Sequence, residues 1–257
     1  CTLETGSEEV CVVCGAPNVK AGSFAVYLAP GNWVYRPGSR VGEDEQRQVI
    51  ESREVANVQS FGVLVSEAEL GLSALHEGIL LLNDDVLREA RPGAAKIHKL
   101  AAGEKLSTYF PGEDVLLEID NKSLTHRPDL WSHFGFAREI AAILGRPLKK
   151  NVDLWADDEA RGRELFAALG AGVSPANEFS VEIEPGCGCR RFTALEFRNV
   201  RSVPSPLWMR RRLFSIGAGV RSFLIDLSNY VMHDVGQPNH AYDADRLSGR
   251  TVYVRLA

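Results

Sequence analysis

Short alternations of apolar and polar residues run through the first third of the chain. Residues 9–14 and 24–28 show this pattern on either side of a turn rich in glycine and proline, and residues 57–65 continue it. A period of two predicts half-buried strands, and Gly, Pro and Asn between them predict tight turns. Residues 66–72 then predict a capped turn. Short strands with turns at this density favour a small β-barrel.

The middle of the chain predicts a strand followed by a helix. Residues 114–119 alternate and predict a half-buried strand that ends in the turn 120–123. Pro128 and Asp129 predict the start of a helix, which Gly145 and Pro147 end. Its apolar residues recur at spacings of three and four, and therefore share one face: Leu130, Phe134, Ala137, Ala141 and Leu144.

The last third mixes both patterns. Residues 179–184 and 192–197 alternate as strands, and a helix is predicted from residues 205–208 up to Gly217. A second, short helix is predicted from Asp226 to Val235, with Gly236 as its stop. Between the middle and the last third, residues 148–178 are rich in charge and predict a linker or surface insertion.

Length and charge limit what this chain can be. A chain of 257 residues is long for one domain and comfortable for two or three. No run approaches the 18 apolar residues of a membrane span, and the first residues lack the regions of a signal peptide. We therefore expect a cytoplasmic protein without a membrane role. The net charge of −5 means that any nucleic-acid contact must be local.

The five cysteines predict reduced thiols. They are odd in number and widely separated, which disfavours a disulfide framework. Cys11 and Cys14 have the spacing of a metal site, but no histidine lies at finger-like spacing, so we expect no metal. The alternation around them suits a buried strand, where a free cysteine behaves as a small apolar residue.

Residues 226–243 contain the polar side chains best suited to bind a ligand or to transfer a proton. Ser228 and Asn229 are predicted near the positive end of a helix, where a carboxylate, a phosphate or a developing oxyanion is favoured. His240 follows nearby and can bind, orient or transfer a proton. The alternative is structural, because Ser and Asn often only cap helices and a single His is commonly a core or surface residue.

Three stretches of the sequence resemble one family. Residues 227–232 and 236–243 look like the substrate-binding and editing module in the beta subunit of bacterial phenylalanyl-tRNA synthetase. Residues 13–19 and 60–66 look like the tRNA-binding OB-fold appended to several synthetases. Residues 124–139 are similar to the Asn-Arg-Pro-Asp segment that opens a helix in the same subunit, with His126 in place of the Asn. The three stretches follow the family's own order.

The resemblance implies an α+β multidomain fold. We expect an OB-fold β-barrel, with its start truncated, in residues 1–106 and a small α/β module with an amphipathic helix in residues 107–148. A linker or insertion would span residues 149–177, and the first part of a mixed α/β editing module would span residues 178–257.

The family resemblance also implies a function. The alpha subunit, the partner in an α2β2 heterotetramer, activates phenylalanine with ATP and Mg²⁺ and charges the tRNA, so no cofactor is expected on this chain. The beta module hydrolyses tyrosine mischarged onto the phenylalanine tRNA, an error that binding alone cannot sufficiently exclude. His240 would orient the substrate or a water, or act as general base. The other implied substrate-binding residues are Ser228, Asn229, Gln237 and Pro238.

The end of the chain and its arginines bear on the implied editing and tRNA binding. The chain ends before the second half of the family's editing module, so we expect that it does not edit alone. The candidates for tRNA contact are Arg127 and the cluster Arg210, Arg211 and Arg212. A local salt bridge explains Arg127 equally well. A favourable position near the C-terminal end of a helix is the preferred explanation for the cluster.

Two other classes of function remain open. One is a noncatalytic tRNA-binding or assembly protein built from the same modules. The other is a small-molecule enzyme with Ser228 as nucleophile and His240 as base, which is disfavoured because the sequence has no nucleophile-elbow motif and no evident third group to orient the histidine.

Overall fold

The chain folds into two compact units. A computed structural model describes residues 1–36, 38, 47–83, 99–110, 114–148 and 179–256. The first unit combines Cys1–Asp120 with Val203–Tyr230, and the second combines Asn121–Ser202 with Val231–Ala257. The expected modules 1–106, 107–148 and 178–257 do not coincide with these units and stay predictions about domains. The expected linker 149–177 lies outside the described residues.

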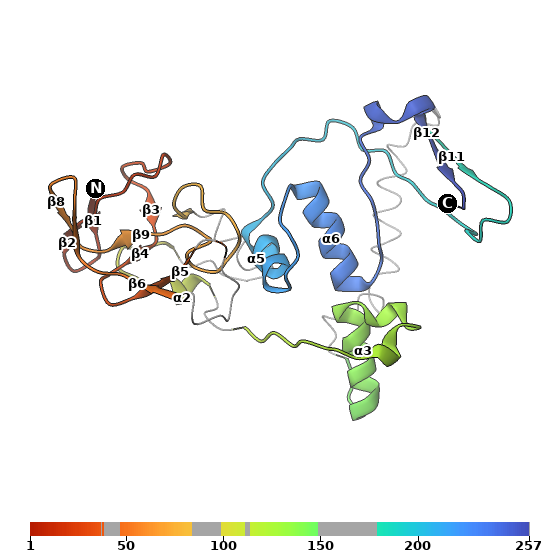
Figure 1. Ribbon diagram of the computed structural model, residues 1–257, viewed down its shortest axis with the longest axis horizontal. Coiled ribbons are helices and arrows are strands. Elements are labelled where there is room, and N and C mark those ends of the chain that lie inside the picture. Colours follow the sequence, from red (N-terminus) through yellow and green to blue (C-terminus); the bar gives the residue numbers. More distant parts are fainter. Residues whose placement is uncertain (37, 39–46, 84–98, 111–113, 149–178, 257) are drawn as a thin grey trace. The chain divides into compact units, whose positions relative to one another are not determined.

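Short antiparallel ladders form the sheet structure of the first unit (Figure 1). The paired strands are β1 (Thr2–Glu4) with β2 (Glu9–Cys11), β3 (Phe24–Ala25) with β10 (Leu81–Leu82), β4 (Tyr27–Leu28) with β9 (Val63–Leu64), β5 (Trp33–Tyr35) with β6 (Arg47–Val49), and β7 (Arg53–Val55) with β8 (Val58–Ser60). The strands predicted within 9–14, 24–28 and 57–65 are thus present in shortened form.

These ladders do not merge into a closed barrel within the part of the chain that the structure describes. Single backbone hydrogen bonds connect them instead. The Val65 N–H donates to the Val26 carbonyl at 3.2 Å, and the Leu80 N–H donates to the Val65 carbonyl at 2.8 Å. The fold is therefore mixed α/β, and the expected OB-fold barrel is not confirmed.

The predicted capped turn follows β9. The Glu69 carboxylate accepts hydrogen bonds from the Ser66 backbone N–H at 2.7 Å and from the Ser66 hydroxyl at 2.8 Å. The Ser66 hydroxyl in turn accepts from the Glu69 N–H at 3.3 Å. This is the reciprocal arrangement of a capping box, and it closes the turn without help from other elements.

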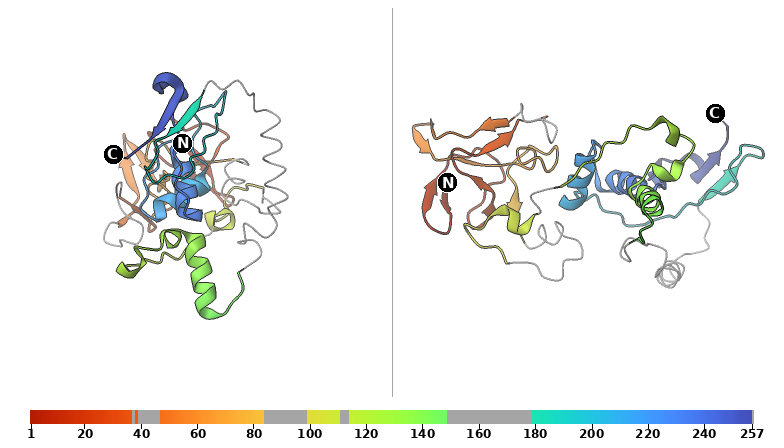
Figure 2. Two further views of the ribbon diagram at one scale, coloured as in Figure 1. Left: turned by 90° about the vertical axis from the view of Figure 1, so that its right-hand side faces the viewer. Right: turned by 90° about the horizontal axis from the view of Figure 1, so that it is seen from below.

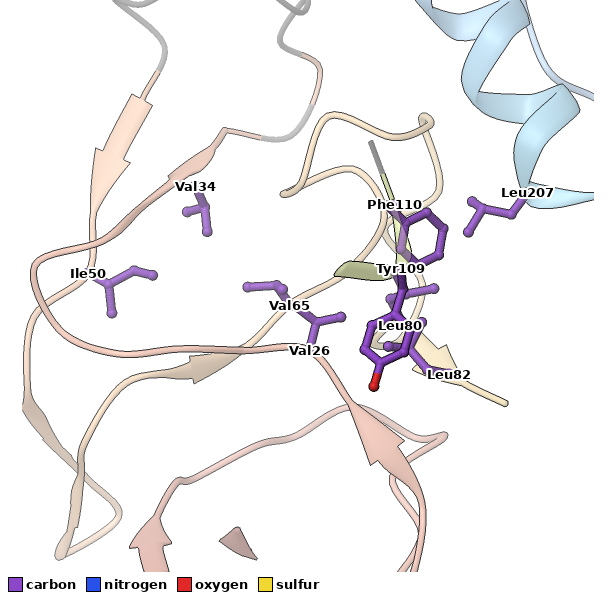
Figure 3. Packing of buried hydrophobic residues seen from close by; sticks show 9 residues of the cluster. All are labelled: Val26, Val34, Ile50, Val65, Leu80, Leu82, Tyr109, Phe110 and Leu207. Atoms are coloured by element: carbon purple, nitrogen blue, oxygen red, sulfur yellow. The ribbon is translucent and has the colours of Figure 1, made fainter. Parts of the chain in front are cut away.

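One apolar core joins the strands to two short helices. It contains Val26, Val34, Ile50, Val65, Leu80, Leu82, Tyr109, Phe110 and Leu207. Tyr109 belongs to α2 (Leu106–Tyr109), and Leu207 opens α5 (Leu207–Ser215). Figure 3 shows Leu207 extending from α5 toward Phe110. Because Leu207 is only 1% exposed, α5 is an integral part of the first unit even though the sequence assigns it to the last module.

The strand predicted at 114–119 is not formed. Residues 114–120 have no regular secondary structure, and the apolar side chains among them are exposed, with Val115 at 80% and Leu117 at 71%. Alternation predicts a strand only if another strand satisfies its backbone and another layer covers its apolar face. Neither partner is present among the described residues.

The second unit begins with two 3₁₀ turns and a helix. The turns η2 (Lys122–Leu124) and η3 (Pro128–Leu130) precede α3 (His133–Leu144). The predicted helix therefore starts later than Pro128, which opens η3. Ser132 caps α3 by accepting the Gly135 N–H at 3.0 Å, and Gly145 ends it in the left-handed conformation, with φ of 59°. The predicted apolar face is incomplete, because Leu144 is 58% exposed.

In the remaining described residues of the second unit, one pair of strands is parallel. Strand β11 (Ser180–Ile183) pairs with β12 (Thr251–Val254), and the 3₁₀ turns η4 (Ala244–Arg246) and η5 (Ser248–Arg250) precede β12. The strand predicted at 192–197 is absent, and Phe197 is 66% exposed. As at 114–119, the alternation has no neighbouring strand to complete it in the described residues.

Candidate functional site

Helix α6 carries two of the predicted substrate-binding residues and begins earlier than predicted. It spans Phe223–Val235, and the Asp226 N–H already donates to the Ser222 carbonyl at 2.8 Å. Ser228 and Asn229 therefore lie beyond the first turn, where backbone N–H groups are bonded within the helix. Their predicted place at a positive helix terminus is wrong. What they can present to a ligand is a half-buried hydroxyl and a half-buried amide.

Asp226 explains the early start of α6. Its side chain is completely buried, at 0% exposure. One carboxylate oxygen accepts the Arg221 backbone N–H at 2.8 Å, and the other accepts the Ser205 hydroxyl. These bonds fix the residues just before the helix and the segment that leads into α5. The sequence pattern placed Asp226 at the start of the helix, because nothing in a local pattern reveals a donor 21 positions away.

Ser205 is also hydrogen-bonded to a second set of polar side chains. Arg210 on α5 donates to the Ser205 carbonyl and binds Glu67 with both arms of its guanidinium, at 3.1 Å from Nε to Oε2 and 2.5 Å from Nη2 to Oε1. The Ser73 hydroxyl donates to Glu67 at 2.7 Å. Arg210 is 12% exposed and Glu67 is 11% exposed. We call Glu67, Ser73, Ser205, Arg210 and Asp226 the buried polar network.

The three arginines proposed for tRNA contact all have partners within the first unit. Arg210 belongs to the buried polar network. Arg211 lies 3.6 Å from the Asp114 carboxylate and is 17% exposed. Arg212, in the last turn of α5, donates to the Tyr230 hydroxyl at 2.5 Å and lies over the Trp208 ring, 5.4 Å from its centroid. Each arginine thus has a partner within the unit, and only Arg212 lies in the last turn of α5, where the sequence favoured a position near the helix end. A role in tRNA binding stays a prediction.

The segment after α6 belongs to the second unit. Gly236 ends the helix as predicted, with φ of 76° and its N–H bonded to the Met232 carbonyl at 3.0 Å. Gln237, Pro238 and His240 are exposed, and the His240 ring centroid lies 6.3 Å from that of Tyr242.

The five predicted editing residues are divided between the units. Ser228 and Asn229 fall in the first, whereas Gln237, Pro238 and His240 fall in the second. Their assignment to one substrate site therefore stays a prediction.

The end of α6 contacts the start of α3 within the second unit. The His133 ring nitrogen Nδ1 lies 3.0 Å from the His233 carbonyl oxygen. A side chain at Gly236 would bring its Cβ within 3.1 Å of the Ser132 hydroxyl. Burial, with a smaller contribution from the charge of His133, lowers the pKa of His233 below its ordinary value. His233 is therefore held in its neutral form more strongly than a solvent-exposed histidine.

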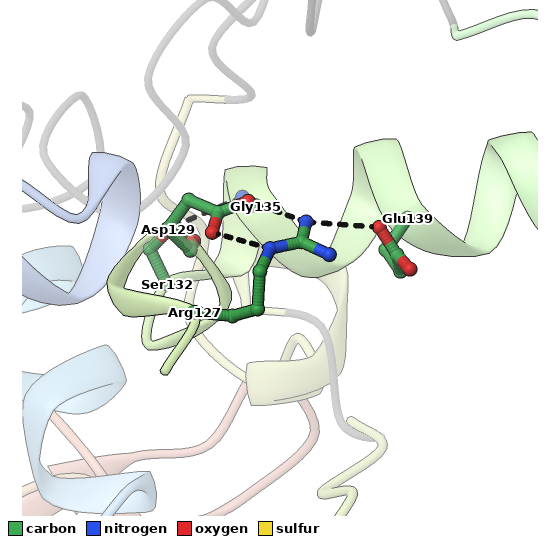
Figure 4. Close-up of polar contacts among 5 residues, drawn as sticks. All are labelled: Arg127, Asp129, Ser132, Gly135 and Glu139. Carbon is green, nitrogen blue, oxygen red and sulfur yellow. Dashed lines mark hydrogen bonds and ion pairs between the residues drawn. The ribbon is translucent and has the colours of Figure 1, made fainter. Parts of the chain in front are cut away.

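Arg127 forms a local ion-pair cluster at the start of α3 (Figure 4). Its guanidinium binds both oxygens of Asp129, at 2.9 Å and 2.8 Å, and reaches Glu139 at 3.1 Å. The hydrogen bond from Arg127 lowers the pKa of the Asp129 carboxyl, and the hydrogen bonds to Asp129 and Glu139 raise the pKa of Arg127. From the sequence, a local salt bridge and an RNA contact explain Arg127 equally well, and the structure contains the salt bridge. A contact with RNA stays a prediction.

The described residues contain neither a cluster of metal ligands nor a membrane-spanning helix. No three His, Cys, Asp or Glu side chains in that part of the chain gather where they could hold a metal ion. Among the same residues, no helix has both the length and the apolar character needed to cross a bilayer. All five cysteines are free thiols.

Comparison with known proteins identifies close relatives. The beta subunit of phenylalanine–tRNA ligase from Solibacter usitatus is 40% identical over 246 residues, which cover 96% of this chain and 25% of the relative. The corresponding subunit of Salinibacter ruber is 35% identical over 95% of this chain, and that of Desulfotalea psychrophila is 33% identical over 100% of it; each match covers 26% of the relative.

A domain family matches the end of the chain. Residues 188–257 match the B3/4 domain, and this range includes α5, α6 and all five predicted editing residues. The chain spans about a quarter of the length of the curated relatives that it matches. Over nearly its whole length, the chain is therefore similar to a segment of these phenylalanine–tRNA ligase beta subunits.

Proposed function

We propose that this chain is a tRNA-binding and editing segment of a phenylalanine–tRNA ligase beta subunit. The observation that carries the proposal is its similarity to three such subunits over 95% or more of its length. The B3/4 match over residues 188–257 supports the assignment of editing to the last part of the chain. The reaction is the hydrolysis of tyrosine wrongly attached to the phenylalanine tRNA.

The proposed partners follow from the relatives' names. A beta subunit implies an alpha subunit, and we propose an α2β2 assembly in the cytoplasm in which the alpha subunit uses ATP and Mg²⁺ to attach phenylalanine to tRNA. The N-terminal strands would form the tRNA-binding OB-fold. Because the chain has a net charge of −5, we expect its contact with RNA to be confined to a small area.

The proposed chemistry is ester hydrolysis. A water attacks the carbonyl carbon of the ester between tyrosine and the terminal ribose, and collapse of the tetrahedral intermediate releases tyrosine and a ribose hydroxyl. The exposed imidazole of His240 orients the water or accepts its proton. Asn229 and Ser228 hydrogen-bond to the tyrosine through their side chains, since their backbone N–H groups belong to the interior of α6.

The test is a deacylation assay on the protein that carries this chain, purified together with its alpha subunit. We expect His240→Ala to slow the hydrolysis of tyrosyl-tRNA(Phe) by roughly 100-fold or more, the range for a general acid–base group. Phenylalanine attachment should be unaffected. His76→Ala, at another exposed histidine, is the control. Unchanged deacylation by His240→Ala would contradict the proposed role of this residue.

The alternative is a noncatalytic tRNA-binding or assembly protein. It predicts that no alpha subunit copurifies, or that the purified assembly does not hydrolyse tyrosyl-tRNA(Phe) at all. Both outcomes are visible in the same preparation before any variant is made.

A further inference from the structure

We propose that Asp226 and Arg210 are positioning residues that fix the rotation of α6 about its axis and thereby the directions of Asn229 and Ser228. The inference rests on the proposed editing function, which it extends to residues that touch no substrate. The observation behind it is the buried polar network, which connects α6 to a turn of the N-terminal strands through α5.

Helix α6 is attached to α5 along one face. An α-helix advances about 100° per residue, so Tyr230, four positions after Asp226, lies within about 40° of it. Asp226 binds the Ser205 hydroxyl, and the Tyr230 ring packs edge-on against Trp208 with centroids 5.0 Å apart. The two helices lie side by side in both Figure 1 and Figure 2. Two contacts one turn apart define the rotation of a helix.

That rotation determines where the candidate substrate residues point. Asn229 lies about 60° from Asp226 around the helix, at the flank of the attached face, and Ser228 lies about 160° from it, near the opposite face. If the Asp226 attachment were lost, the helix could turn about its axis, and Asn229 and Ser228 would move together. A displacement of about 1 Å at a reacting centre can cost roughly 100-fold in rate.

Arg210 holds Ser205 in the position from which its hydroxyl binds Asp226. Its guanidinium binds the carbonyl of Ser205, the residue whose hydroxyl binds Asp226. Its other nitrogens are paired with Glu67, 143 positions earlier in the chain. Because these groups are buried or largely buried and are hydrogen-bonded to one another, the loss of one leaves its partners unsatisfied and favours a rearrangement of the whole network.

The test combines Arg210→Met with Asn229→Ala in the complete assembly with the alpha subunit. We expect Arg210→Met to lower kcat for deacylation of tyrosyl-tRNA(Phe) roughly 10- to 100-fold. The KM for tRNA in phenylalanine attachment should stay unchanged, because the Arg210 guanidinium is bonded to Glu67 and Ser205. A raised KM would indicate that Arg210 contacts tRNA instead and would overturn the inference. Asp226→Asn, which keeps the shape of the side chain, should act in the same direction. Arg146→Met removes an exposed arginine and is the control.

The double variant separates positioning from a general loss of stability. If Arg210 acts through Asn229, the variant with both changes deacylates about as slowly as Asn229→Ala alone, since coupled residues are not additive. Multiplied losses, or wild-type deacylation by Arg210→Met, would overturn the inference. If Arg210→Met does not fold, Arg210→Lys serves in its place, because it keeps the charge beside Glu67 and loses the forked contact.

The same assay distinguishes failure of the inference from failure of the proposed function. If Asn229→Ala and His240→Ala both deacylate like the wild type, the proposed editing site is wrong and the inference falls with it. If these two variants are slow and Arg210→Met is not, the editing site stands and only the positioning role is refuted.

Discussion

Replacement of Leu207 by alanine tests whether α5 belongs to the N-terminal unit. Leu207 is 1% exposed and packs in the core that also contains Val65, Leu80 and Phe110. Truncation of a buried leucine to alanine costs about 2–5 kcal/mol, because contacts are lost and a cavity remains. With a middle value of about 3 kcal/mol, the population of the opened unit rises roughly 100-fold.

Hydrogen exchange with mass spectrometry measures this effect region by region. We expect peptides covering residues 63–82 of the Leu207→Ala chain to exchange faster, together with peptides covering α5. Leu144→Ala is the control, because Leu144 is 58% exposed and its truncation should change stability by less than about 0.5 kcal/mol.

The opposite pattern would refute the reasoning. If residues 203–230 folded as part of a separate C-terminal domain, Leu207→Ala would accelerate exchange only in peptides after residue 203. Peptides covering residues 63–82 would then exchange at the rate of the wild-type chain. Leu207 would not contribute to the stability of the N-terminal core.

Three further predictions concern the second unit. Gly135→Ala should destabilise it by at least about 1–3 kcal/mol in denaturant unfolding, because the new Cβ would lie 1.6 Å from the Asp129 carbonyl oxygen; Gly219→Ala, in open space, should not. Asp129→Asn should lower the melting temperature at neutral pH. The lowered pKa of Asp129 means that the difference from wild type disappears as the pH falls below about 3.9 and through that pKa, so a constant difference would contradict the ion pair. His233 has a lowered pKa, so protonation favours the unfolded chain; its contribution to stability should fall as the pH drops below about 6.5, and His233→Gln should flatten that part of the melting-temperature profile.

Local patterns in the sequence were sufficient for the features that neighbouring residues determine. The capping box of Ser66 and Glu69, the end of α5 near Gly217 and the end of α6 at Gly236 each depend on hydrogen bonds or backbone angles within a few residues. The salt bridge between Arg127 and Asp129 is of the same kind. The motifs that carry the family resemblance are also short continuous runs, so they can be recognised without knowledge of the structure.

Only the tertiary structure decided which distant groups meet. Alternation at 114–119 and 192–197 describes a strand with one apolar face, but a strand forms only beside a partner, which the described residues do not supply. The start of α6 depends on the burial of Asp226 against Ser205, and the role of Arg210 depends on Glu67. The sequence by itself determined the family resemblance and the ends of the helices, because both depend on short continuous runs of residues. Packing between residues far apart determined that α5 joins the N-terminal core and that Ser228 and Asn229 lie within α6 instead of at its positive end.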